Sequence, residues 1–266
     1  MEILSKIFEY PFVLRAVITG VLLCCCAALL GVNLVLKRYS MLGDGLSHVS
    51  FGAAAIALAF GFAPLQFSIP IVIIAAFLLL RINGNGKIKG DAAISIVSTS
   101  ALAIGITVAN LTTGMNTDIS NYMFGSILAL GTEDVVYSVI ISVLVIALYI
   151  MFYNKIFAVS FDEKFAASSG INVKFYNGLS AVLTAVTVVV GMRIMGALLI
   201  SSIITFPVLS AMRVTKKYRS TVILSVIISV VAFLIGIILS FSFDIPAGAA
   251  VVLTNLAIFI ILNCFS

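Results

Sequence analysis

Long apolar stretches, separated by short polar ones, fill most of this chain. Each is close to the roughly 20 residues that an α-helix needs to cross about 30 Å of hydrocarbon. The pattern predicts nine such spans, at 14–36, 46–62, 66–81, 92–111, 134–152, 174–191, 194–211, 220–240 and 247–264. Some stretches are short enough for one pair to form a broken or re-entrant helix, so eight spans is the alternative. We therefore expect an all-α polytopic membrane protein with eight or nine transmembrane helices.

The polar segments between the spans are mostly simple turns. Two are longer: residues 112–133, where Asn121–Leu128 predicts a short outer helix, and residues 153–173. Residues 1–12 alternate apolar and charged positions in a way that is typical of an interfacial amphipathic helix. No linker or low-complexity tract divides the chain, so residues 1–266 are expected to form a single transmembrane domain.

Composition and charge agree with this interpretation. The chain is 62% hydrophobic and only 9% charged, whereas soluble domains carry about 25% charged residues. Of 15 Lys and Arg residues, the nine-span topology places all but Lys6, Arg15 and Arg193 on one side, which the positive-inside rule makes cytoplasmic. The N-terminus is then outside, and Arg193 is expected to reach lipid headgroups. The net charge of +5 lies in short loops, so nucleic acid is not the expected partner.

The longest predicted cytoplasmic loop contains a short capped helix at about 160–170. Ser160 followed by Glu163 has the spacing of a capping box, and Gly170 can end the helix in a left-handed conformation. Phe161 and Phe165 are four residues apart and share one face. A helix of about two turns is too short to be stable alone. It either lies on the bilayer or its own bundle, or docks into a groove of a soluble partner.

Asp44 and His48 are the candidate metal ligands. They are four residues apart at the start of the second span, so a helix would place both on one face. Outside a membrane, a helix cap and a satisfied core histidine would explain them, but both groups are costly to bury in lipid. Oxygen and nitrogen together suit manganese or zinc. Two ligands do not fill four positions, whereas a twofold dimer would supply two of each.

Several motifs together carry a family resemblance. They are Met41–His48, Gly90–Ile96, Met123–Leu128, Phe161–Ile171, Gly196–Ile200 with Pro207, and Asp244–Ala249. In this order they resemble the permease subunits of zinc/manganese/iron ABC importers. One departure is the sequence Val49-Ser50-Phe51-Gly52, where members of the family often have Ala-Val-Leu-Pro. This difference weakens any inference about which metal is preferred.

The resemblance implies a function and a set of partners. It implies a homodimeric permease in the bacterial plasma membrane, two cytoplasmic ATP-binding subunits and an extracytoplasmic metal-binding receptor. Manganese, zinc or iron would be the transported substrate, with no permanently bound cofactor. Asp44 and His48 would correspond to the metal pathway, and the ATPase-coupling residues would be Phe161, Asp162, Glu163, Phe165 and Gly170.

The permease itself is not expected to be an enzyme. The sequence has no Gly-x-x-x-x-Gly-Lys-Ser/Thr phosphate loop, so ATP hydrolysis is expected in a separate subunit. One histidine and no His-Glu-x-x-His pattern argue against an intramembrane metalloprotease. The main alternative is a secondary transporter driven by a proton or sodium gradient, with Asp44 and His48 as the relay. A siderophore or vitamin ABC permease would share the plan but need no Asp–His pair.

Overall fold

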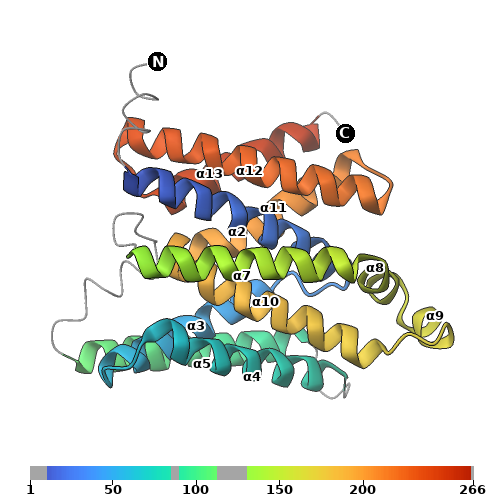
Figure 1. Ribbon diagram of the computed structural model, residues 1–266, viewed down its shortest axis with the longest axis horizontal. Coiled ribbons are helices and arrows are strands. Elements are labelled where there is room, and N and C mark those ends of the chain that lie inside the picture. Colours follow the sequence, from blue (N-terminus) through green and yellow to red (C-terminus); the bar gives the residue numbers. More distant parts are fainter. Residues whose placement is uncertain (1–10, 85–89, 113–130, 265–266) are drawn as a thin grey trace.

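The computed structural model describes residues 11–84, 90–112 and 131–264, whose regular elements are all α-helices (Figure 1). Nine of these described helices are long and apolar enough to cross a membrane. They are α2 (Pro11–Leu36), α3 (Leu42–Ala59), α4 (Pro64–Gly84), α5 (Gly90–Leu111), α7 (Thr132–Met151), α10 (Val173–Met195), α11 (Ala197–Val214), α12 (Tyr218–Phe243) and α13 (Ala247–Cys264). The predicted polytopic all-α fold is confirmed, with nine spans rather than eight in the described part.

Helix boundaries differ from the predicted ones by a few residues. The largest consequence is at the second span, which begins at Leu42 instead of 46, so Asp44 lies inside the helix. The predicted outer helix at Asn121–Leu128 lies outside the described residues. So does the predicted helix at 1–12, except for residues 11 and 12, which begin α2.

The two ends of the bundle differ in charge. Two short helices, α8 (Tyr153–Phe161) and α9 (Glu163–Ser168), follow α7 at one end (Figure 1). We call this the basic end, because most of the described cations lie at the helix termini and turns there: Lys37, Arg38, Arg81, Lys155, Lys164, Lys174, Arg213, Lys216, Lys217 and Arg219. By the positive-inside rule it faces the cytoplasm.

At the opposite end, Arg193 does not reach for lipid headgroups as the sequence suggested. Its Nη2 is 3.0 Å from Oδ2 of Asp134, in the first turn of α7. Both side chains are largely buried, and a carboxylate so close satisfies the guanidinium better than a distant headgroup would. The pair joins α7 to the last turn of α10.

The interior is organised around α2, α3 and α10, which are the most buried of the spans. Helix α2 packs against α12 and α11 and against α7 and α10, while α10 also contacts α3 and α4 (Figure 1). Glycines permit the closest approaches, as expected where lipid provides little hydrophobic drive. A Cβ atom on Gly52 would lie 2.6 Å from the carbonyl oxygen of Ala101, so α3 and α5 touch backbone to backbone.

We expect Gly52→Ala to lower the thermal stability of the protein, because the added methyl group would force α3 and α5 apart. Overpacking of this kind costs about 1–3 kcal/mol. The measurement is the unfolding midpoint in detergent, followed by size-exclusion chromatography after heating. Gly131→Ala is the matched control, since a Cβ atom there meets only Asp134 Oδ2 at 3.6 Å. Equal midpoints for the two variants would contradict this packing.

Candidate functional site

Asp44 and His48 occupy one face of α3, as the sequence predicts. Asp44 lies in the first turn, where the helix dipole favours a carboxylate, and His48 follows one turn later. The Nε2 atom of His48 is 3.6 Å from Oδ2 of Asp44, and the two side chains are 27% and 49% exposed. This distance is too long for a hydrogen bond. The two groups are therefore close neighbours that do not satisfy each other.

The start of α3 packs against neighbouring spans on two sides, although Asp44 remains half exposed on its third side. A Cβ atom on Gly43 would be 2.8 Å from Cδ1 of Ile204, a residue in the middle of α11. On another side, a Cβ atom on Gly45 would be 2.5 Å from Cγ2 of Ile94 in α5. These two glycines hold α3 against both neighbours. Asp44 and His48 lie on the face between those two contacts.

Asp44 lines a hollow of about 410 Å³ between the start of α3, α11 and α13. Hydroxyl groups are frequent among its lining residues Ser40, Ser201, Ser202 and Thr205. Three of them donate hydrogen bonds within α11: Ser201 to Leu198, Ser202 to Leu199 and Thr205 to Ser201. Their oxygen lone pairs therefore remain available. The sequence analysis missed these residues, although Ser201 and Thr205 have the helical spacing of Asp44 and His48.

The described residues of one chain do not complete a metal site. His48 is not among the residues that line the hollow, and no group of three or more His, Cys, Asp or Glu side chains suited to a metal occurs in the described ranges. Asp44 and His48 supply one oxygen and one nitrogen ligand, whereas a closed zinc site uses four. Further ligands must come from hydroxyl groups, water or a second chain.

The predicted coupling helix is capped by Asp162, not by Ser160. The backbone of Asp162 is extended, and its carboxylate accepts hydrogen bonds from the backbone N–H groups of Lys164 (2.9 Å) and Phe165 (3.0 Å). Ser160 instead belongs to α8 and is buried. The Asp162 cap divides the segment into α8 and α9, so Phe161 and Phe165 do not share one helix. Ser160 cannot cap α9 because it lies inside α8, whereas Asp162 has the extended backbone that an N-cap residue needs.

Both phenylalanines are nevertheless exposed at the basic end. Phe161 is 77% exposed and Phe165 is 66% exposed, while Ala166 is fully buried and fixes the inner face of α9. Gly170 ends the segment with a φ of 80°, as predicted, a conformation that suits glycine. The segment thus presents two large, exposed apolar side chains at this end of the bundle.

Glu163 ties α9 to the rest of the bundle. Its Oε1 atom accepts hydrogen bonds from Lys37 Nζ (2.9 Å) and from Asn177 Nδ2 (3.0 Å), and Lys37 also bonds Asn177. Partial burial tends to raise the pKa of Glu163. The bonds from Lys37 and Asn177 outweigh it and hold this pKa below its ordinary value. Local sequence patterns do not predict this contact, because Lys37 and Glu163 are far apart along the chain.

Lys37 also begins the turn that leads to Asp44. The turn is tight: Arg38 has a φ of 61°, and the N–H of Tyr39 donates to the carbonyl of Leu34 (2.7 Å). The N–H of Leu42, the first residue of α3, donates to the carbonyl of Tyr39 (2.9 Å). A short, hydrogen-bonded path therefore connects the base of α9 with the candidate metal ligands.

Comparison with known proteins agrees with this architecture. The sequence model of the ABC 3 transport family matches residues 9–266, which is nearly the whole chain. The chain belongs to the ABC 3 transport family. It is therefore a multi-pass membrane protein of a transport family, in line with the spans described above.

Relatives of this ABC 3 family chain align over almost their full lengths. The manganese import system permease protein ScaB of Streptococcus gordonii is 28% identical, over 98% of this chain and 93% of that protein. The high-affinity zinc uptake system membrane protein ZnuB of Haemophilus influenzae is 29% identical, over 96% and 97%.

Two solved structures share the fold. PsaBC from Streptococcus pneumoniae, in complex with Fab, matches with a TM-score of 0.88 and 29% identity, over 98% of this chain and 94% of that one. A metal-chelate type ABC transporter in an inward-facing conformation matches with a TM-score of 0.79, over 96% and 86%; at 18% identity it supports the fold alone.

We expect Glu163→Gln to weaken the attachment of α9, lowering the unfolding free energy by about 0.5 kcal/mol, as is usual for a partly exposed ion pair. Because the pKa of Glu163 is lowered, its contribution is complete above the ordinary value of 4.5 and disappears as the pH falls through the lowered value. The double exchange Lys37→Glu with Glu163→Lys should restore most of the loss. Lys164→Gln is the control; an equal loss there would refute the specific pair.

Proposed function

We propose that this chain is the membrane-spanning subunit of an ATP-driven importer of divalent metal ions. Manganese and zinc are the leading candidates, and iron is the third. The observation that carries the proposal is the Asp44–His48 pair, held within the bundle beside a hydroxyl-lined hollow. Such groups are costly inside a membrane unless they serve a pathway.

The chemistry of the pair favours a transition-type cation over an alkali or alkaline-earth ion. An imidazole nitrogen binds zinc or iron well, while the carboxylate and the hydroxyl oxygens around it supply the harder ligands that manganese prefers. Relatives named for manganese and for zinc both align over most of this chain, which supports the same two metals. An incomplete ligand set also suits transport, since the ion must leave as readily as it arrives.

A homodimer would complete the pathway. Met41, which lines the hollow, is 55% exposed. In a single chain this face of α3 is therefore not covered by the other described helices. In a twofold dimer the same residues meet their own copies, and two Asp44–His48 pairs would approach one another. Two oxygen and two nitrogen ligands would then satisfy the four positions that a single chain leaves incomplete.

ATP would be hydrolysed by partner subunits bound at the basic end. The chain lacks a phosphate loop, so it needs a separate ATPase. The exposed Phe161 and Phe165 form the natural docking surface, since two adjacent large apolar side chains can fill a groove on a soluble protein. An extracytoplasmic receptor would deliver the metal at the opposite end.

The link between Glu163 and Lys37 provides a route for coupling. Movement of α9 by the ATPase would pull on Lys37, and the tight turn after Lys37 would pass the displacement to the start of α3. Asp44 and His48 would then change their distance from the partner copy's pair. The site would open alternately toward the receptor and toward the cytoplasm.

Replacing a metal ligand should abolish transport without unfolding the protein. We expect Asp44→Asn and His48→Ala each to lower metal uptake at least about tenfold in proteoliposomes that contain the full transporter, because one ligand of a weak site is lost. Uptake of ⁵⁴Mn or ⁶⁵Zn is the measurement. Asp91→Asn is the control, since Asp91 is also a carboxylate in the first turn of a span. Normal uptake by both ligand variants would refute the assignment.

The same assay distinguishes the secondary-transporter alternative. If a proton or sodium gradient drove transport, the permease alone would take up metal without ATP. We expect uptake only with the ATPase subunits and ATP.

The double variant Phe161→Asp with Phe165→Asp should prevent the ATPase from binding, because charged side chains do not enter an apolar groove. The measurement is co-purification of the tagged permease with its ATPase. Phe243→Asp is the matched control, a phenylalanine that is 70% exposed at the opposite end. Normal co-purification of the double variant would rule out this docking surface.

A further inference from the structure

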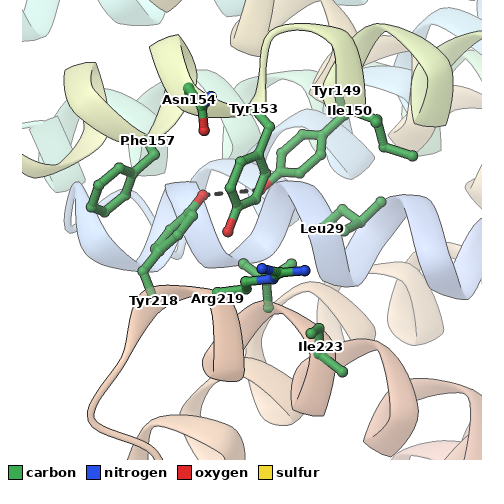
Figure 2. A pocket seen from close by; sticks show the side chains of 10 residues that line it. Leu29, Tyr149, Ile150, Tyr153, Asn154, Phe157, Tyr218, Arg219 and Ile223 are labelled. Carbon is green, nitrogen blue, oxygen red and sulfur yellow. Dashed lines mark hydrogen bonds between the residues drawn. The ribbon is translucent and has the colours of Figure 1, made fainter.

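A groove of about 870 Å³ lies at the basic end, away from the hollow beside Asp44. One wall comes from the end of α7 and the start of α8, and the other from the first turns of α12 (Figure 2). Leu29 of α2 forms its floor. Helices α7 and α12 both pack against α2, and the groove occupies the space between them.

Two of the hydrogen-bond donors that line the groove, those of Tyr153 and Arg219, find no acceptor in the part of the chain that the structure describes. The hydroxyl of Tyr153 is buried and has no hydrogen-bond partner among residues 11–84, 90–112 and 131–264. The guanidinium of Arg219 faces the same groove (Figure 2), and among the described residues no carboxylate lies within ion-pair distance of it. A buried donor without an acceptor is costly, and the exposed guanidinium of Arg219 in the same groove adds a positive charge that suits an anionic acceptor.

The other two tyrosines of the groove are already satisfied. The hydroxyls of Tyr149 and Tyr218 lie 3.0 Å apart, and Tyr218 donates to Oδ1 of the buried Asn33 at 2.7 Å. The rings of Tyr153 and Phe157 pack on Tyr218, with centroids 5.5 and 4.4 Å away. This cluster holds the wall in place. The hydroxyl of Tyr153, the guanidinium of Arg219 and the exposed amide of Asn154 remain available to a ligand.

The groove is polar at the basic end and apolar deeper among the spans. Arg219 and Tyr218 begin α12 at the basic end, while Val222 and Ile223 lie one turn deeper, level with the apolar floor. The rim is open to the side: Ile150 is 65% exposed and Ile223 is 51% exposed, like the other apolar residues on the outer faces of α7 and α12. A ligand must therefore be anionic near the membrane surface and apolar one turn further in.

We propose that this groove binds the headgroup of an anionic phospholipid from the cytoplasmic leaflet. The phosphate accepts hydrogen bonds from the guanidinium of Arg219 and the hydroxyl of Tyr153, and one acyl chain lies against Ile150 and Ile223. Basic pockets between spans on the cytoplasmic side suit such lipids, and that leaflet is the anionic one. The lining residues that the structure describes include one cation and no carboxylate.

The tyrosine remains a donor under physiological conditions. Burial raises the pKa of Tyr153, and the opposing effect of the nearby Arg219 is smaller, so the hydroxyl stays protonated. A bound phosphate would bridge α8 and α12. Because α8 leads directly into α9, the lipid would also brace the base of the coupling segment.

Native mass spectrometry of the purified full-length permease tests the site. We expect the protein to retain phosphatidylglycerol in preference to phosphatidylcholine. Arg219→Gln should weaken phosphatidylglycerol binding about tenfold, because a charge-assisted hydrogen bond is lost. Tyr153→Phe should weaken it to a smaller degree. Lys216→Gln, which removes a neighbouring charge outside the groove, should bind as the wild type does.

One further variant and one soluble probe keep the test decisive. If Arg219→Gln elutes as aggregate, Arg219→Lys keeps the charge without the planar fork and should give an intermediate affinity. Glycerol 3-phosphate should fail to displace the lipid, because it lacks the acyl chain that the apolar wall holds. Unchanged binding in the Arg219 variants, an equal loss in Lys216→Gln, equal retention of both lipids, or displacement by glycerol 3-phosphate would each overturn the proposal.

Discussion

Hydrocarbon offers no hydrogen-bond partner. A polar group within the bundle must therefore bond to another group of the protein, or be left unpaired because it serves a function. Most polar groups here bond to another group of the protein. The hydroxyls of α11 donate to carbonyls of their own helix, Tyr218 donates to Asn33, and Arg193 pairs with Asp134. Several buried groups, among them Ser50 and Asn255, have no partner within the described ranges. Asp44 and His48 are an ionisable pair in a similar position, since at 3.6 Å they do not complete one another. Their incomplete partnership is the physical reason to regard them as ligands.

Close helix packing is what makes this arrangement possible. Gly43 and Gly45 let α3 rest against Ile204 and Ile94, so the helix is fixed from two sides while its third face stays open. Larger residues at these positions would move the helix and with it both candidate ligands. The small residues around Asp44 therefore contribute to the geometry of the site as much as the ligands do.

The base of α9 and the candidate metal site belong to one connected structure. Glu163 is held by Lys37, and Lys37 begins the turn that leads into α3. The chain departs from simple sequence rules at this point, because Asp162 breaks the segment into two helices and frees Glu163 to bond across the bundle. A capping box with Ser160 would have used Glu163 locally and left Lys37 without it.

Sequence alone determined the all-α polytopic fold and the approximate placement of the spans, with eight or nine left open, because each span must supply enough apolar length to cross the bilayer whatever its neighbours are. It also placed Asp44 and His48 on one helical face, since that follows from a period of 3.6 residues. Tertiary structure decided what those faces meet: the hydroxyls of α11 beside Asp44, Lys37 on Glu163, Asp134 on Arg193, and the groove beside Tyr153 and Arg219. Such contacts join residues far apart along the chain. The packing that brings them together does not show in the local pattern of apolar and polar residues, so the sequence could not predict them.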